Sequence, residues 1–138
     1  MDVMLLRALA DASGPSGHED RVRALVLQEL AGLTDRVDTD PMGCVDGVRT
    51  STDASAGRLM LAAHMDEIGL MITHVDDRGF AKFIPLGGWD AKTLVDQRVL
   101  VQGREDLVGI VGTTPVHLMD EAARTRAPKI EDLAIDLC

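Results

Sequence analysis

The sequence predicts a mixed α/β fold, with a layered α/β part followed by a β-rich part. Apolar residues follow a helical spacing in the first third of the chain and a two-residue spacing after it. From residue 69 onward, short strand-like segments alternate with turn residues, which is typical of a small barrel or sandwich. We place the boundary near residues 66–69, which gives domains of residues 1–66 and 67–138.

The first third of the chain predicts two helices. Asp2 is suited to cap a short helix whose apolar residues share one face. Pro15 disfavours helical backbone at the residue before it and ends that region. A capping box made by Ser16 and Glu19 predicts the start of a second helix, which runs to about Leu30.

Strand patterns follow in the rest of the first part. Residues 36–39 and 44–48 alternate between apolar and polar side chains, as half-buried strands do. After a polar loop at residues 50–57, the apolar run at residues 58–63 is typical of a central strand that is covered on both faces. Two helices followed by such a strand indicate an α/β layered domain.

The second part predicts a set of short strands. Residues 69–75 and 80–84 read as a hairpin around the turn at residues 76–79. Further strands are expected at residues 94–102, 107–111 and 133–137, with a basic, proline-containing loop at residues 124–129.

Composition excludes several classes of protein. The 138 residues carry a formal net charge of −9, which argues against binding the phosphate backbone of nucleic acids. No apolar run approaches the roughly 20 residues needed to span a bilayer, so we expect no membrane association. The first residues lack a basic region typical of a secretory signal, and two cysteines make no disulfide framework. We therefore expect a cytoplasmic protein.

The sharpest chemical feature is the pair His64 and Asp66. On an extended chain these side chains point to the same side, directly after the predicted strand at residues 58–63. Ligands usually bind at the carboxyl ends of strands in open α/β sheets, and an imidazole with a nearby carboxylate suits a metal site. The alternative is structural: His64 caps the strand and Asp66 caps the next turn.

Other side chains are weaker candidates. Glu67 is adjacent to the pair but points to the opposite face. His18 and His74 are expected to be solvated surface residues. Cys44 is expected to be a small core residue, because nothing near it in sequence would lower its pKa.

Two residues of the second part are candidates for a substrate or interface role. His117 lies in a loop and could face a cleft. Trp89 lies between Gly88 and Asp90, where it could act as a surface anchor or as a plug in a hinge loop. An interface role suits an exposed tryptophan, because tryptophan is common among residues that dominate binding energy.

Five blocks of the sequence, in order, match the motifs of one enzyme family. They are SGPSGHE at residues 13–19, AAHMDEIGLM at 62–71, IPLGGWD at 84–90, QRV at 97–99 and PKIEDL at 128–133. The sequence resembles the di-metal aminopeptidases that include the glutamyl and tetrahedral aminopeptidases, some of which have been labelled endoglucanases or cellulases. The resemblance covers essentially the whole chain, although Cys44 stands where the family commonly has Asn.

The resemblance implies a function and a site. Residues 1–66 would begin a zinc-aminopeptidase-like catalytic domain, and residues 67–138 would form part of an inserted, incomplete β-barrel-like assembly domain. Two divalent metal ions, zinc or cobalt, would serve the removal of N-terminal residues from peptide substrates. His64 would be a metal ligand and Asp66 a catalytic group that orients its neighbours. The resemblance also implies a homo-oligomer, between a dimer and a dodecamer.

Family members are typically more than twice as long as this chain, so we expect it to be an N-terminal portion. The apolar run before Cys138 is then expected to be a strand cut short. The remaining ligands and the general-base glutamate would lie beyond it, and we expect the chain alone to be catalytically inactive. Two alternatives stay open: a non-catalytic oligomerisation module built on residues 67–138, and a lone metal-binding protein that uses His64.

Overall fold

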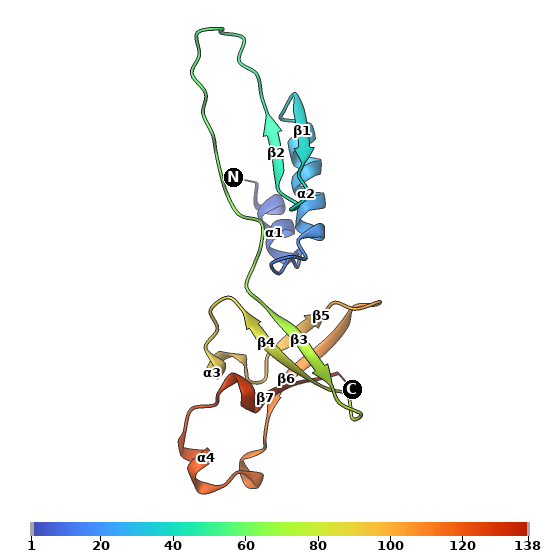
Figure 1. Cartoon of the computed structure of the whole chain (residues 1–138), viewed down its shortest axis with the longest axis vertical. Coiled ribbons are helices and arrows are strands. Elements are labelled where there is room, and N and C mark those ends of the chain that lie inside the picture. Colours follow the sequence, from blue (N-terminus) through green and yellow to red (C-terminus); the bar gives the residue numbers. More distant parts are fainter. Residues whose placement is uncertain (1, 138) are drawn as a thin grey trace. The chain divides into compact units, whose positions relative to one another are not determined.

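The computed structural model describes residues 2–137 and divides the chain into two compact units, Met1–Glu67 and Ile68–Cys138. The first unit contains two helices and a two-stranded sheet, and the second contains a five-stranded sheet with short helices (Figure 1). The mixed α/β prediction is confirmed. Whether the units are a catalytic domain and an inserted domain stays a prediction.

Helix α1, Val3–Asp11, begins as the sequence predicts. The carboxylate of Asp2 accepts hydrogen bonds from the backbone N–H groups of Met4 at 2.8 Å and Leu5 at 3.3 Å. These two donors would otherwise have no partner inside the helix, so Asp2 satisfies them as an N-cap.

Helix α2, Asp20–Ala31, begins later than the predicted capping box. The box is wrong: Glu19 is the N-cap and forms no side-chain cap, while its carboxylate accepts from the Gly17 N–H at 2.6 Å. The His18 N–H donates to the Pro15 carbonyl at 2.8 Å, and Gly17 has a φ of 86°. A tight turn therefore occupies these residues, and the left-handed glycine delays the helix.

The two strands predicted in the first unit are confirmed as β1, Arg36–Thr39, and β2, Val45–Val48, and the structure pairs them antiparallel. Helix α2 packs on both strands. The close approach is visible at Gly47, where an added Cβ would lie 2.9 Å from the Thr34 side chain and 3.4 Å from that of Leu30. A small residue in β2 thus lets the end of α2 lie against the hairpin.

The predicted strand at residues 58–63 is wrong. This segment forms no strand in the described part of the chain, and the side chains of Leu59, Met60 and Leu61 are 86–88% exposed. Figure 1 shows it as part of the long connection that follows β2. An apolar run indicates a preference for burial, but a strand also needs a neighbouring backbone with which to pair. In the described part of the chain, no strand pairs with residues 58–63.

The second unit is built on one antiparallel sheet in the order β3-β4-β7-β6-β5. Most of the predicted strands are confirmed, and Cys138 lies outside the described residues. The elements are β3 Gly69–Val75, β4 Phe80–Leu86, α3 Ala91–Leu94, β5 Arg98–Val101, β6 Leu107–Thr113, the 3-10 helix η1 Val116–Leu118, α4 Glu121–Thr125, the 3-10 helix η2 Ile130–Asp132, and β7 Leu133–Asp136.

Two predicted segments of this unit differ from the structure. The strand expected at residues 94–102 is shorter, because α3 occupies its start and is capped by Asp90, whose carboxylate accepts from the Lys92 N–H at 3.0 Å. The basic loop at residues 124–129 begins inside α4. Both differences arise where a short helix replaces an extended or irregular segment.

The core of the second unit lies against the inner face of the sheet. It is formed by residues from β4, β6 and β7 together with Leu94 of α3, and these are buried: Ala81, Phe83, Leu94, Val111, Leu133 and Ile135. Gly109 of β6 lies on the same face, where an added Cβ would meet the Ile135 side chain and lie 3.2 Å from the Asp136 carbonyl oxygen. The core is therefore mainly aliphatic, in keeping with the low aromatic content of the sequence.

Candidate metal centre

His64 and Asp66 lie in contact. The Nδ1 atom of His64 is 3.0 Å from the Asp66 carboxylate Oδ1 and 2.9 Å from the Asp66 carbonyl oxygen. Both oxygens are acceptors, so we expect the neutral ring to carry its hydrogen on Nδ1 and to keep the lone pair on Nε2. The His64 side chain is 84% exposed, so Nε2 is accessible from solution. A histidine that ligates a metal is usually oriented in this way, by a carboxylate or carbonyl on its other nitrogen.

Glu67, next to this pair, is bonded to Gly14. The Gly14 N–H donates to the Glu67 carboxylate at 2.9 Å, and the Glu67 N–H donates to the Gly14 carbonyl at 2.9 Å. Pro15 and Glu67 form an isolated parallel bridge. Gly14 suits this place because an added Cβ would lie 2.7 Å from the Val22 side chain of α2.

This contact brings together the turn before α2 and the segment that carries His64. The sequence did not predict it, because Glu67 was expected only to point to the opposite face from His64 and Asp66. Gly14 and Glu67 are 53 positions apart, so no local periodicity could have revealed the pairing. The one available signal was that both lie in sequence blocks shared with the same enzyme family.

The described residues do not by themselves form a metal site. Among residues 2–137, no group of three or more His, Cys, Asp or Glu side chains is placed to hold a metal ion. A catalytic zinc ion generally needs three protein ligands, and a two-metal site needs more. The Glu67 carboxylate is already bonded to the Gly14 amide. A ligand role for His64 therefore stays a prediction, and it would require further donors.

Comparison with known proteins decides the family. The model of the M42 glutamyl aminopeptidases matches residues 43–138. The lysyl aminopeptidase of Pyrococcus furiosus is 36% identical over 124 residues, a match that covers 88% of this chain and 35% of that protein. The chain belongs to the M42 glutamyl aminopeptidase family. The resemblance stated from the sequence motifs is thereby confirmed.

Solved structures of M42 relatives share the fold of this chain. A TET aminopeptidase from a marine-sediment Thaumarchaeota archaeon superposes with a TM-score of 0.90 at 30% identity, over 97% of this chain and 37% of its own. The TET1 peptidase of Pyrococcus horikoshii, which assembles into a tetrahedron or a large octahedral shell, gives a TM-score of 0.79 at 31% identity, over 98% of this chain and 40% of its own. The chain thus spans well under half the length of these M42 relatives.

The two candidates of the second unit, Trp89 and His117, differ in their surroundings. Trp89 is half-buried against the core, and its Nε1–H donates to the Gly69 carbonyl at 2.9 Å, which favours the plug over the surface anchor. His117 is exposed in η1. A substrate or interface role for either residue stays a prediction.

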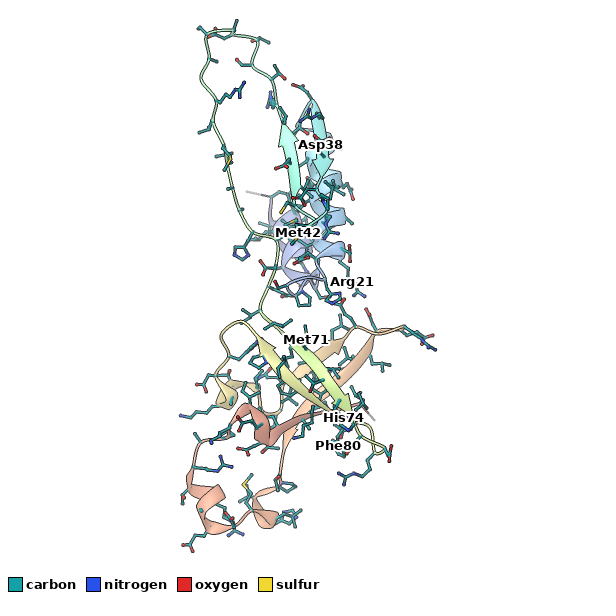
Figure 2. All side chains as sticks on the ribbon, viewed as in Figure 1. Arg21, Asp38, Met42, Met71, His74 and Phe80 are labelled. Atoms are coloured by element: carbon teal, nitrogen blue, oxygen red, sulfur yellow. The ribbon has the colours of Figure 1, made fainter. Side chains whose placement is uncertain are left out.

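The remaining single residues divide between confirmed and wrong predictions. His18 and His74 are exposed, as predicted, and Figure 2 shows His74 on the hairpin of β3 and β4. Cys44 is exposed, so the prediction of a core cysteine is wrong. The negative charge of Asp40 is the main cause that raises the pKa of the Cys44 thiol, which confirms that the thiol is not activated.

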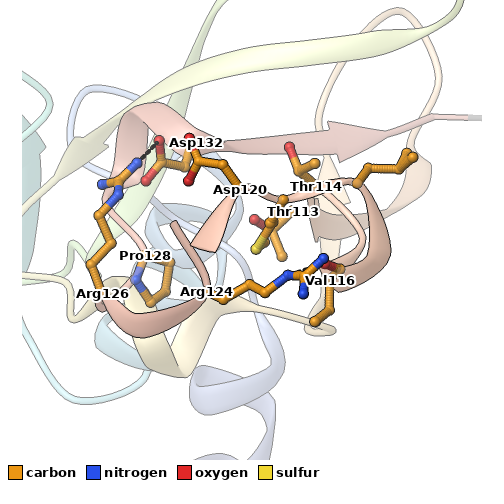
Figure 3. A pocket seen from close by; sticks show the side chains of 10 residues that line it. Thr113, Thr114, Val116, Asp120, Arg124, Arg126, Pro128 and Asp132 are labelled. Atoms are coloured by element: carbon orange, nitrogen blue, oxygen red, sulfur yellow. Dashed lines mark hydrogen bonds and ion pairs between the residues drawn. The ribbon is translucent and has the colours of Figure 1, made fainter. Parts of the chain in front are cut away.

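A hollow of about 430 Å³ lies among residues 113–132 of the M42 chain (Figure 3). On its rim the Arg126 guanidinium pairs with the Asp132 carboxylate at 3.0 Å, and the Arg124 Nε–H donates to the Val116 carbonyl at 3.0 Å. The pKa of the Asp132 carboxyl lies below its usual range. The main cause is its hydrogen bond from the Lys129 backbone N–H, and the second is its hydrogen bond from the Arg126 side chain. These two arginine contacts join parts of the loop that lines the hollow.

In the described residues, no helix is both long enough and apolar enough to cross a membrane.

Proposed function

We propose that this chain provides the N-terminal part of a metal-dependent M42 aminopeptidase that removes N-terminal residues from peptides. The observation that carries the proposal is the geometry of His64, whose Nδ1 contacts two oxygens of Asp66 while Nε2 is exposed. Membership of the M42 family and the aminopeptidase names of its relatives support the reaction class.

Within this proposal, His64 is a metal ligand and Asp66 is the group that fixes its tautomer and ring orientation. The two hydrogen bonds between Glu67 and Gly14 hold the segment just after the pair. Two divalent ions, zinc or cobalt, would need additional ligands, because residues 2–137 hold no group of three or more His, Cys, Asp or Glu side chains placed for a metal ion. We accordingly propose that the chain alone is inactive.

We also propose that Ile68–Cys138 serves assembly into a homo-oligomer, while Met1–Glu67 belongs to the catalytic domain. The large assemblies formed by the TET1 peptidase of Pyrococcus horikoshii support this proposal. A second candidate function, a non-catalytic oligomerisation module, is favoured by the apolar side chains that the second unit exposes on its sheet, among them Val108 and Ile110.

A chimeric enzyme distinguishes these functions. This chain replaces the matching N-terminal segment of the lysyl aminopeptidase of Pyrococcus furiosus, and hydrolysis of aminoacyl p-nitroanilides is measured with zinc or cobalt. We expect the chimera to be active, His64→Ala to abolish turnover, and His74→Ala, another exposed histidine, to leave it unchanged. Full activity of the His64→Ala chimera would reject the catalytic role and leave the oligomerisation module.

A further inference from the structure

We propose that Arg23 of helix α2 is a positioning residue for the segment that carries His64. The Arg23 side chain joins the start of α2 to the turn before it and to the loop between β1 and β2. The same turn holds Glu67, which follows His64 closely in the chain. The inference rests on the proposed ligand role of His64 and adds a residue that keeps the ligand segment in place.

The guanidinium of Arg23 binds groups from different segments of the first unit. Its Nε–H donates to the Gly43 carbonyl, in the loop between β1 and β2, at 2.9 Å. One terminal nitrogen donates to the Asp20 carboxylate at 2.5 Å, and the other lies 3.6 Å from the Glu19 carboxylate. An arginine can hold several groups in fixed directions at once, because its donors form a planar fork.

The ion pair of Arg23 and Glu19 is largely buried. Their side chains are 18% and 17% exposed, whereas Arg36, which pairs with Asp38 in the same unit, is 70% exposed. Exposed ion pairs contribute little because water screens them, while removing one partner of a buried pair leaves an uncompensated charge. Loss of Arg23 should therefore disturb Glu19, and loss of Arg36 should disturb little.

The loop between β1 and β2 has a shape that admits this guanidinium. Gly43 has a φ of 88°, a backbone conformation that favours glycine. An added Cβ at Gly43 would meet the end of the Arg23 side chain and lie 3.0 Å from its Cζ atom. A side chain at this position would push the guanidinium away, so the glycine permits the contact.

Glu19 transmits the constraint to the turn before α2. Its carboxylate accepts from the Gly17 N–H at 2.6 Å. At the other end of the same turn, Gly14 and Glu67 exchange two hydrogen bonds of 2.9 Å each. Without its counterion the Glu19 carboxylate gains by turning to solvent, which breaks the contact with Gly17 and loosens the turn that holds Glu67.

Hydrogen exchange of the purified chain tests the inference without any metal. We expect Arg23→Gln to speed exchange of the Gly14 amide about tenfold, because the turn then opens more often. The Asp35 amide, which donates to the Val48 carbonyl at 2.8 Å elsewhere in the first unit, is the reference for general destabilisation and should change by about twofold at most. Arg36→Gln, the exposed control, should leave both amides unchanged.

Further variants show whether Arg23 acts through Glu19. Glu19→Gln keeps an acceptor for the Gly17 N–H but removes the charge, and it should speed Gly14 exchange in the same way. The double variant R23Q/E19Q should exchange no faster than Arg23→Gln alone, because residues that act through one contact are not additive. Arg23→Lys keeps the charge without the fork and should restore part of the protection. If Arg23→Gln does not fold, Glu19→Gln carries the same comparison.

Zinc binding by the chimeric enzyme connects this contact to His64. Competition with a chelator measures the zinc dissociation constant of each variant. Groups that orient a metal ligand directly change metal affinity by about 10- to 100-fold, and Arg23 lies further from the metal, so we expect Arg23→Gln to raise the constant about three- to tenfold. Arg36→Gln should leave it unchanged.

The outcomes separate this inference from the proposed function. If Arg23→Gln leaves Gly14 exchange unchanged, or speeds the Gly14 and Asp35 amides equally, the inference is rejected. An unchanged zinc dissociation constant in Arg23→Gln, in a chimera whose zinc depends on His64, rejects it as well. If the wild-type and His64→Ala chimeras hold equal zinc, the ligand role fails, and the exchange rates alone decide whether Arg23 fixes the segment.

Discussion

Glu67 and Gly14 are joined by a reciprocal pair of hydrogen bonds, each 2.9 Å long, although they lie 53 residues apart. The Glu67 carboxylate accepts from the Gly14 N–H, and the Gly14 carbonyl accepts from the Glu67 N–H. This contact fixes the segment directly after His64 and Asp66 to the turn that precedes α2. The proposed metal ligand is thus supported on its C-terminal side by a part of the chain that is distant in sequence.

Removing the Glu67 carboxylate should loosen this contact. We expect Glu67→Ala to speed hydrogen exchange of the Gly14 amide by about tenfold, because one charge-assisted hydrogen bond is lost. Glu67→Gln keeps an acceptor oxygen and should change the exchange rate much less. Exchange measured by NMR or mass spectrometry tests this, and equal rates in the wild type and Glu67→Ala would show that the bond does not hold the segment.

The tautomer of His64 is a second prediction. Because Nδ1 faces two acceptor oxygens of Asp66, the neutral ring should carry its hydrogen on Nδ1. Long-range ¹⁵N NMR distinguishes this from the Nε2–H form, and Asp66→Ala should shift the ring toward Nε2–H. The exposed His74 serves as the internal reference. A wild-type His64 with its hydrogen on Nε2 would contradict the geometry from which the ligand role is argued.

The chain alone should have no peptidase activity. Among residues 2–137 the side chains do not supply three clustered ligands, so added zinc or cobalt lacks a complete site. Aminoacyl p-nitroanilides incubated with the purified chain and either metal should show only the background rate. Turnover that survives purification and disappears in His64→Ala would prove that the described residues suffice for catalysis.

Gly109 should be intolerant of a side chain. A Cβ there would meet the buried Ile135 side chain and the Asp136 carbonyl, so Gly109→Ala should cost about 1–3 kcal/mol of stability by overpacking. A loss of this size corresponds to a fall in melting temperature of roughly 5 °C or more. Gly88→Ala is the control, since nothing lies within 4 Å of its added Cβ. Calorimetry that finds the two variants equally stable would argue against close packing at β6.

Local signals predicted much of the second unit. The hairpin of β3 and β4 could be predicted because the residues that form its turn lie directly between the two strands. In that turn the Asp76 carboxylate accepts hydrogen bonds from the N–H groups of Arg78 and Phe80 at 2.9 Å each. The pKa of the Asp76 carboxyl is lowered mainly by its bond to the Phe80 N–H. Asp90, the cap of α3, is a comparable local signal, and it favours a helix start before the strand expected at residues 94–102.

Features that depend on distant residues could not be predicted in this way. The apolar run at residues 58–63 has the composition of a buried strand, but strand formation depends on a neighbouring backbone, which no local pattern reports. The contact between Glu67 and Gly14 is missed for the same reason. The proximity of His64 and Asp66 was predictable, because residues two apart on an extended chain share a side.

Metal content of the chimeric enzyme tests the central claim, that His64 is a metal ligand of an M42 aminopeptidase. The wild-type chimera, His64→Ala and the control His74→Ala are each loaded with zinc and freed of excess metal, and bound zinc is counted by elemental analysis. The account predicts that His64→Ala loses bound zinc, while His74→Ala retains the wild-type amount. Equal zinc in His64→Ala and the wild-type chimera would contradict it.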